Sequence, residues 1–200
     1  MVKGGIKSKI PRIGLFGGTF NPVHCGHIKI ANFLKKKLHL NEIIFVPSAR
    51  PPHKADIDII PFKYRYEMVC IATADFKGFS VSDVELKRKG KSYTIDTLRY
   101  FKKKTGADIY FIAGSDSILD ITTWKAYKKL FEECYFVVVN RPGFAINKIK
   151  IPKEYFINVK IKGIHISSSE IRARISKGLR TNKLIPGKVE NYIREKRLYK

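Results

Sequence analysis

The chain has 200 residues, of which 44% are apolar and 28% are charged, and its formal net charge is +23. This length predicts a single domain, residues 1–200, with a sizeable core, and the composition is typical of a globular protein rather than a disordered one. Its apolar runs fall well short of the ~18 residues that a membrane-spanning helix needs, which argues against a membrane protein.

The opening residues, MVKGGIKSKIPR, are basic and lack the apolar stretch of a signal peptide. We expect residues 1–12 to form a flexible lead-in. The three cysteines, Cys25, Cys70 and Cys134, form no CxxC pair and are odd in number. This pattern argues against a disulfide framework and predicts a protein of the reducing cytoplasm.

Apolar runs alternate along the chain with segments of helical periodicity. The runs predict strands over 13–16, 42–47, 79–86, 108–114, 134–140 and, more weakly, 156–166. The segments between them predict helices over 26–38, 62–74, 93–104, 123–132, 168–177 and 187–197. Such alternation indicates an α/β fold, a Rossmann-like doubly wound parallel sheet, with 165–200 as a helical C-terminal part. In these sheets ligands bind at the carboxyl ends of the strands, so the loops there hold the candidate site.

The first such loop, GGTFNPVHCGH, lies between the first predicted strand and the first predicted helix. Gly17 and Gly18 allow a tight turn and a close approach of a ligand to the backbone. The helix that follows directs N–H groups and a partial positive charge to the same place, which suits an anion. His24 and His27 share one face of the helix start, and Gly26 leaves room there for a flat ring.

A pair of nearby histidines can also be a capping or surface feature, or part of a zinc site. The segment HCGH offers three soft ligands, but Cys25 would point away from the shared face of the histidines. Cys70 and Cys134 lie in apolar periodic segments, so no fourth ligand is evident. We therefore expect no metal bound by protein ligands alone.

A second helix start near the C-terminal end, ISSSEIR, also suits a phosphate. Ser167 and Glu170 form the S-x-x-E pattern of a capping box. The N–H groups and hydroxyls of Ser168 and Ser169, with Arg172 one turn later, would suit a pyrophosphate. A plain capped helix would satisfy the box alone, but two phosphate-suited helix starts in one chain favour a nucleotide site.

The two motifs together resemble HxGH and ISSTxIR, the signatures of the nucleotidylyltransferase superfamily, which shares its site with class I aminoacyl-tRNA synthetases. This resemblance implies ATP binding by Gly17, Gly18, Thr19, Phe20, His24, Gly26, His27, Ser167, Ser168, Ser169 and Arg172.

Further segments, from Gly14 to about Arg172, resemble the bacterial nicotinate mononucleotide adenylyltransferases. PSARPPHK resembles their PxxxPPHK loop, KSYTIDTL their SYTxDTL, AGSDS their GxD and NRPG their RPG, while TTWKAY supplies the only Trp. The resemblance implies that nicotinate mononucleotide is bound by Lys54, Tyr93, Thr94, Asp116, Trp124 and Arg141. The chain departs from the family pattern at Asn21, where Asp is common, and at Ser169, where Thr is common; both keep a hydrogen-bonding group.

The resemblance implies transfer of the adenylyl group of ATP to nicotinate mononucleotide, with His24, His27, Lys54 and Arg172 as the catalytic residues. The attacking phosphate has a second pKa of about 6 and is already largely dianionic at neutral pH, so no general base is required. Positioning two anions and stabilising charge on the α-phosphate are what the site must supply. The cofactor expected is Mg²⁺, held mainly by the ATP phosphates.

Three alternatives stay open at the level of sequence. Phosphopantetheine adenylyltransferases share both motifs, but usually in a shorter chain without the PPHK and SYT elements. A nicotinamide mononucleotide enzyme would share most of the chemistry. A basic RNA-binding protein would fit the charge of +23, but the lysines are scattered or in triplets, as on solvated helix faces, and no RNA motif is evident. We expect no specific nucleic-acid partner.

Overall fold

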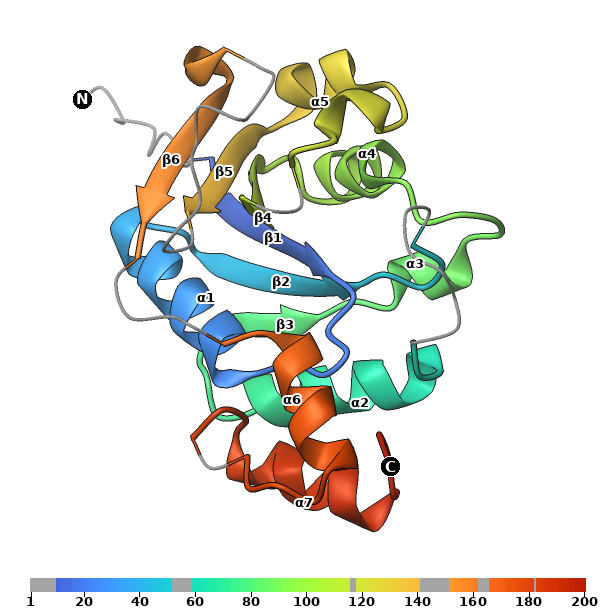
Figure 1. The fold of residues 1–200 in the computed structure, drawn as a ribbon. Coiled ribbons are helices and arrows are strands. Elements are labelled where there is room, and N and C mark those ends of the chain that lie inside the picture. Colours follow the sequence, from blue (N-terminus) through green and yellow to red (C-terminus); the bar gives the residue numbers. More distant parts are fainter. Residues whose placement is uncertain (1–9, 52–58, 116–117, 141–151, 162–165, 182) are drawn as a thin grey trace, which may run out of the picture.

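The alternating strands and helices build one six-stranded parallel sheet that is covered by helices on both faces (Figure 1). The structure, a computed structural model, describes residues 10–51, 59–115, 118–140, 152–161, 166–181 and 183–200. The strands are β1 (Arg12–Gly18), β2 (Glu42–Pro47), β3 (Phe79–Val81), β4 (Asp108–Gly114), β5 (Tyr135–Asn140) and β6 (Phe156–Lys160). The helices are α1 (Cys25–Lys37), α2 (Phe62–Thr73), α3 (Val84–Lys87), α4 (Thr94–Thr105), α5 (Tyr127–Glu133), α6 (Ser168–Ser176) and α7 (Gly187–Glu195).

The strand order β3-β2-β1-β4-β5-β6 confirms the predicted doubly wound α/β fold. The chain leaves β1 for β2 and β3 on one side, and then returns to β4, which pairs with the other edge of β1. The direction of winding therefore reverses between β1 and β4. In an open parallel sheet a crevice forms at the carboxyl ends of the strands at this switch point, and ligands bind there.

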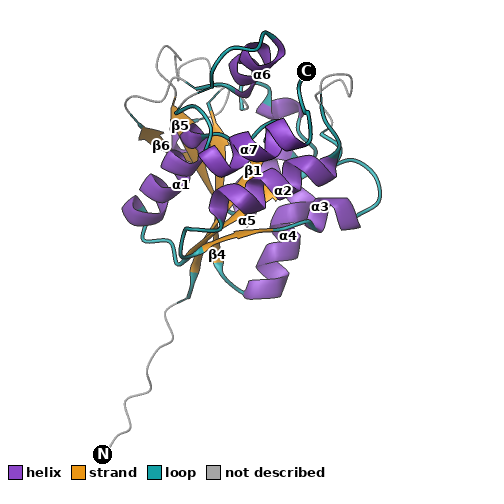
Figure 2. Ribbon diagram, turned by 90° about the horizontal axis from the view of Figure 1, so that it is seen from below, coloured by secondary structure: helices purple, strands orange, loops and turns teal. Residues whose placement is uncertain are grey.

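Two hydrophobic cores lie on the two faces of the sheet, and helices cover both faces (Figures 1 and 2). Successive side chains of a strand point to opposite faces, so Phe16 and Leu15 of β1 enter different cores. The first core includes buried residues of α1, α2, α6 and α7, and the second includes buried residues of α4 and α5. The continuous apolar runs of the sequence reflect this burial on both faces.

Two predicted elements differ from the structure. The strand predicted over 79–86 ends at Val81, and α3 follows it. The Ser82 hydroxyl accepts the backbone N–H of Val84, a local bond that diverts the chain from the sheet. The helix predicted over 123–132 begins only at Tyr127, because Ala126 has a left-handed φ of 53°.

The C-terminal part is helical where it is described, with α6 and α7 packed against the core that α1 and α2 share. Lys188 of α7 also forms an ion pair of 2.8 Å with Asp75, just after α2. The second half of the weakly predicted strand, residues 162–165, and the lead-in residues 1–9 lie outside the described residues. The single-domain organisation and the lead-in stay predictions.

Candidate active site

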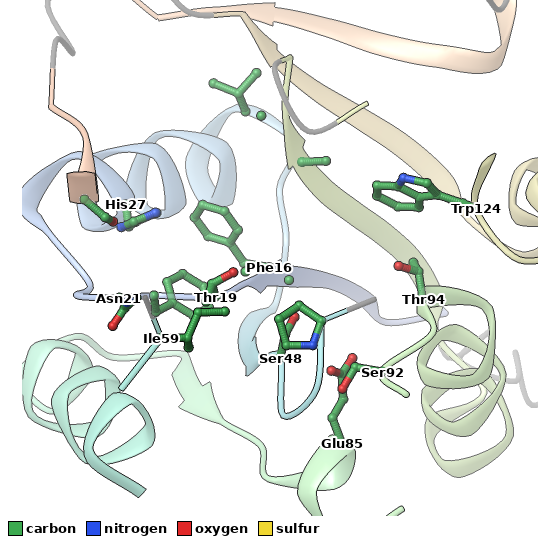
Figure 3. Close-up of a pocket in the computed structure, with 18 of the residues that line it drawn as sticks. Phe16, Thr19, Asn21, His27, Ser48, Ile59, Glu85, Ser92, Thr94 and Trp124 are labelled. Carbon is green, nitrogen blue, oxygen red and sulfur yellow. The ribbon is translucent and has the colours of Figure 1, made fainter. Parts of the chain in front are cut away.

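A cavity of about 1100 Å³ opens at the carboxyl ends of β1, β2 and β4, at the switch point of the sheet (Figure 3). His27, Asn21 and Thr19 lie at one end of it, and Trp124 and Thr94 lie at the other. A ligand in this cavity would therefore contact the HxGH loop and the region around the Trp together.

The two histidines form a reciprocal cap at the start of α1. His24 is the N-cap residue, and its Nδ1 accepts the backbone N–H of His27 over 3.3 Å. The Nδ1 of His27 in turn accepts the backbone N–H of His24 over 3.2 Å. The two rings stack with their centroids 3.6 Å apart. His24 thus takes the place that Ser or Thr has in other capping boxes, and His27 takes the place of Glu or Gln.

This cap determines which ring nitrogens carry protons. A nitrogen that accepts an N–H has no proton of its own, so each neutral ring is protonated at Nε2. His24 is 1% exposed, whereas His27 lines the cavity with Phe20 packed edge-on against its ring at 5.0 Å between centroids. His27 therefore has a fixed ring orientation and the chemistry of a hydrogen-bond donor.

The predicted role of the glycines needs a correction. Gly17 and Gly18 are the last residues of β1 rather than a turn after it, and neither has a left-handed φ. A side chain at either position would crowd a neighbouring ring, since a Cβ on Gly17 would lie 3.2 Å from the ring of Phe111 and one on Gly18 would lie 3.0 Å from that of Phe20. Both glycines line the cavity, so the close approach of a ligand to their backbone stays a prediction. The turn is made by Phe20, with a φ of 49° and a ring only 2% exposed. The packed ring holds this strained backbone in place.

A buried arginine of α2 holds the beginning of the loop between β1 and α1. Arg65 is 1% exposed, and its Nη1 donates to the carbonyl of Thr19 over 2.8 Å, while its Nε donates to the carbonyl of Ile60 over 3.0 Å. Burial lowers the pKa of Arg65 from its ordinary value, but an arginine remains charged at neutral pH. The loop thus has a fixed positive charge behind it.

The second motif forms only half of the predicted capping box: the Ser167 cap is confirmed, whereas the side chain of Glu170 is directed to Arg174 and not back to the N-cap backbone. Ser167 is the N-cap of α6, and its Oγ accepts the backbone N–H of Glu170 over 3.1 Å. The carboxylate of Glu170 lies 3.9 Å from the guanidinium of Arg174. Ser167, Ser168, Ser169 and Arg172 all line the cavity, on the same side as the histidines.

Side chains of α6 also hold the loop between β1 and α1. The Ser168 hydroxyl donates to the carbonyl of Pro22 over 2.9 Å, so it joins two segments of protein instead of standing ready for a phosphate. Arg172 donates from Nη1 to the carbonyl of Asn21 over 3.0 Å. A guanidinium has five N–H donors, so this bond orients Arg172 and leaves it the capacity to bind an anion.

Trp124 lies at the opposite end of the cavity and also packs on the core. Its ring is edge-on to Phe111 with centroids 6.4 Å apart, and 6.3 Å from the ring of Phe136. Tyr93, the N-cap residue of α4, and Thr94, its first residue, line the same end. This end therefore combines a flat aromatic surface with the positive end of a helix.

Lys125 adds a cation beside Trp124. Its Nζ lies 4.6 Å from the centroid of the Tyr93 ring and 3.1 Å from the carboxylate of Asp96. The loop before α4 is joined to the loop after β2. The hydroxyl of Ser92, in the first of these loops, accepts the backbone N–H groups of Ala49 and Arg50 in the second.

The structure brings together most of the predicted site residues that it describes. Those that line the cavity are Gly17, Gly18, Thr19, Phe20, His27, Tyr93, Thr94, Trp124, Ser167, Ser168, Ser169 and Arg172. His24 and Gly26 are buried beneath them and do not line it. Lys54, Asp116 and Arg141 lie outside the described residues.

Residues that sequence reasoning did not place in the site include Asn21, Ser48, Asp120 and Lys125, all of which line the cavity. Asn21 lies within GGTFNPVHCGH and Lys125 within TTWKAY, so their place in these segments could have indicated them. Ser48 directly follows β2, where the carboxyl-end rule applies.

Comparisons with known proteins identify the family of the chain. The sequence profile described as cytidylyltransferase-like matches residues 15–174. A probable nicotinate-nucleotide adenylyltransferase of Moorella thermoacetica is 41% identical to this chain, covering 94% of the chain and 92% of the relative. The chain belongs to the nicotinate-nucleotide adenylyltransferase family, within the wider cytidylyltransferase-like group.

Another member of the nicotinate-nucleotide adenylyltransferase family, from Thermoanaerobacter sp. strain X514, is also 41% identical, with 94% of both proteins covered. The solved structure of Plasmodium falciparum nicotinic acid mononucleotide adenylyltransferase complexed with NaAD has a TM-score of 0.78 and 24% identity, over 94% of this chain and 97% of that one. This likeness confirms the fold. Among the described residues, no helix has the length and apolar character to cross a membrane.

Proposed function

We propose that the chain transfers the adenylyl group of ATP to nicotinate mononucleotide, giving deamido-NAD and pyrophosphate. One observation carries the proposal: a single cavity joins the capped histidine pair and Arg172 to Trp124 and Lys125. Each end matches one nucleotide. The free cysteines Cys25, Cys70 and Cys134 suit the cytoplasm, which we propose as its location.

ATP would bind at the histidine end. The N-termini of α1 and α6 and the guanidinium of Arg172 supply partial and full positive charges for the phosphates. His27 would donate from Nε2 to an oxygen of the α-phosphate, where negative charge grows during the transfer. His24 would act on the reaction by holding the ring of His27 through their stacked, reciprocal cap.

The transfer needs no oxidant and no general base. A phosphate oxygen of nicotinate mononucleotide attacks the α-phosphorus of ATP, and a new P–O bond forms between them. The bond from the α-phosphorus to the oxygen that bridges to the β-phosphate breaks, and pyrophosphate leaves with that electron pair. Because nucleophile and electrophile are both anionic, fixed positive groups in the cavity overcome their repulsion and align them.

Nicotinate mononucleotide would bind at the opposite end. Trp124 offers a flat surface for the pyridine ring, and Thr94 offers the N-terminus of α4 to a carboxylate. Lys125, which also pairs with the carboxylate of Asp96, places a cation beside both. A nicotinamide ring carries a neutral amide in place of the carboxylate, so it would gain less from this cation and would leave the N–H donors of α4 less well satisfied.

Three residues of the proposal lie outside the described part of the chain. We propose that Lys54 contacts a phosphate, that Asp116 accepts nucleotide hydroxyls and that Arg141 lies near the nucleotide, as the family motifs imply. Asp120, which lines the cavity close to Asp116 in sequence, offers a further acceptor.

Mg²⁺ is proposed to enter with ATP as part of the substrate. In the described residues no three His, Cys, Asp or Glu side chains come together as a metal-binding group. Mg²⁺ bound to nucleotides keeps several waters and takes few protein ligands, so a cavity lined, among the described residues, by only two carboxylates, Glu85 and Asp120, fits this form of binding. The ion would neutralise part of the charge on the phosphates.

The test compares three acceptors with ATP and Mg²⁺ in one buffer: nicotinate mononucleotide, nicotinamide mononucleotide and phosphopantetheine. We expect kcat/KM to favour nicotinate over nicotinamide mononucleotide by roughly ten- to several-hundredfold, since one poorly satisfied buried group costs about 1–3 kcal/mol. Lys125→Gln should reduce that preference. Lys128→Gln removes the same charge from the exposed face of α5 and should leave it unchanged.

Release of pyrophosphate is the readout for each acceptor. Equal kcat/KM with nicotinate and nicotinamide mononucleotide would reject nicotinate mononucleotide as the preferred substrate but would still support adenylyl transfer. Turnover with phosphopantetheine alone would favour the alternative within the same superfamily.

A further inference from the structure

The C-terminal end of the chain returns to the candidate active site. In Figures 1 and 2 the C-terminus lies beside α6 and α7. Leu198 is buried in the core that α1 and α2 share, and Tyr199 packs against the same core. The hydroxyl of Tyr199 donates a hydrogen bond of 2.9 Å to Oδ1 of Asn21, 178 residues earlier in the chain.

Asn21 is the residue through which this contact reaches the cavity. It lines the cavity wall and is 5% exposed (Figure 3). Its side chain accepts from Tyr199, and its main-chain carbonyl accepts from Nη1 of Arg172 over 3.0 Å. Arg172, which would bind the phosphates of ATP, is therefore oriented by the carbonyl of Asn21. Asn21 is in turn held in place by Tyr199.

The surroundings of Tyr199 keep its hydroxyl a donor. Burial raises the pKa of Tyr199 well above its ordinary value, although the nearby charges of Arg172 and Arg65 act in the opposite direction. The phenol stays protonated at neutral pH as a result. Arg65 holds the carbonyl of Thr19 in the same loop, so the loop is fixed at both Thr19 and Asn21 by side chains from other parts of the chain.

We propose that Tyr199 is a positioning residue for ATP: it holds Asn21, and through Asn21 it fixes the loop that orients Arg172. This inference rests on the proposed adenylyl transfer and adds the last turn of the chain to the ATP end of the site. Tyr199 itself does not line the cavity, so it acts on ATP only through these residues.

The test uses the full chain with Tyr199→Phe, which removes one oxygen and keeps the ring. We expect KM for ATP to rise about three- to tenfold, the range that loss of one neutral hydrogen bond gives. KM for nicotinate mononucleotide should change less than twofold, because Trp124 and Lys125 lie at the other end of the cavity. Calorimetry with ATP alone should show the same loss of affinity, independently of turnover.

Asn21→Ala separates positioning from general loss of structure. If Tyr199 acts through Asn21, this variant should weaken ATP binding as Tyr199→Phe does, and the double variant should bind ATP no more weakly than Asn21→Ala alone. Losses that add in the double variant would overturn the proposal.

Tyr192→Phe is the matched control. Tyr192 is also half-buried, and its hydroxyl also joins the C-terminal region to another helix, by a hydrogen bond to Glu67 of α2. Neither residue lines the cavity. Tyr192→Phe should lower the melting temperature and leave KM for ATP unchanged. An unchanged ATP affinity in Tyr199→Phe would overturn the positioning role. A wild-type protein that binds ATP but does not transfer its adenylyl group would reject the proposed reaction and would leave the positioning role to be judged by ATP binding.

Discussion

At the scale of single residues, His24 and His27 have a structural role as helix caps, and we propose a chemical role for them in phosphate binding. Each Nδ1 caps a backbone N–H at the start of α1, and the same bond fixes the proton of the neutral ring on Nε2. A Ser or Thr in place of His24 and a Glu or Gln in place of His27 would form the same cap. We therefore attribute the imidazole of His27, which lines the cavity, to the second ring nitrogen, which in the proposed reaction would donate to a phosphate.

His27→Ala should lower turnover by a hundredfold or more, which corresponds to about 2.7–4 kcal/mol for loss of a donor to the transition state. Because the ring of His27 also accepts the N–H of His24, the variant should lose about 0.5–2 kcal/mol of stability as well. Steady-state kinetics and urea unfolding measure the two effects.

His39→Asn is a control for the loss of an imidazole. His39 lies just beyond α1 with a φ of 52°, which Asn tolerates, and it is remote from the cavity. We expect its turnover to equal that of the wild type. A folded His27→Ala protein with normal turnover would contradict the role given to the HxGH motif.

At the scale of elements, α4 and α5 are joined by Glu133. Its carboxylate accepts from Arg99 over 3.0 Å and from Lys102 over 3.2 Å. The hydrogen bond from Arg99 is the largest effect and lowers the pKa of Glu133. Burial, the next largest, acts in the opposite direction, and the hydrogen bond from Lys102 adds to the lowering. A carboxylate with a lower pKa in the folded chain stabilises the fold above its unfolded pKa, and this contribution is lost as pH falls through the folded pKa.

Glu133→Gln should therefore lower the free energy of unfolding at pH 7 by about 0.5–1 kcal/mol, since both cationic partners are half exposed. The difference from wild type should shrink as the pH falls below about 4, the ordinary range of a glutamate. Glu132→Gln, on the exposed side of α5, is the matched control and should have little effect. A difference that persists at pH 2 would show that packing, not charge, stabilises this contact.

The sequence predicts the elements whose signal is local. Strands such as 108–114 are continuously apolar because they are buried on both faces, and the structure confirms them. The end of β3 at Val81 depends on one hydroxyl, that of Ser82, and the start of α5 depends on the left-handed Ala126. Neither alters the hydrophobic pattern, so periodicity alone misplaces these boundaries.

The same distinction applies to the site. The HxGH and ISSSEIR motifs are contiguous, and local spacing identifies their helix starts. The contacts that hold the loop between β1 and α1 come from Arg65, Ser168 and Tyr199, which are far from it in sequence. Only the folded chain brings them together, because their spacing depends on how α2, α6 and the C-terminal end pack on one face of the sheet.

At the scale of the whole molecule, the net charge of +23 has a partly structural explanation. Two lysine triplets, 35–37 and 102–104, occupy the last turns of α1 and α4. Cations there interact favourably with the negative end of the helix dipole. These ends lie at the edge of the sheet opposite the cavity, since a helix that connects parallel strands runs back along them. The triplets thus stabilise helices and raise the overall charge, and we expect them to form no specific nucleic-acid site.

Nucleic acid should accordingly bind only weakly and without sequence preference. Scattered lysines bind phosphates by releasing counterions, so we expect dissociation constants in the micromolar range or weaker at physiological salt. Between about 50 and 200 mM KCl the affinity should fall by tenfold or more. Fluorescence anisotropy with labelled single-stranded RNA and duplex DNA of unrelated sequences measures this, and we expect the same fall for both. Turnover at saturating ATP and nicotinate mononucleotide should be little changed by an excess of the same RNA, because the triplets face away from the cavity. A nanomolar complex with one sequence at physiological salt would show that the basic surface has a partner of its own.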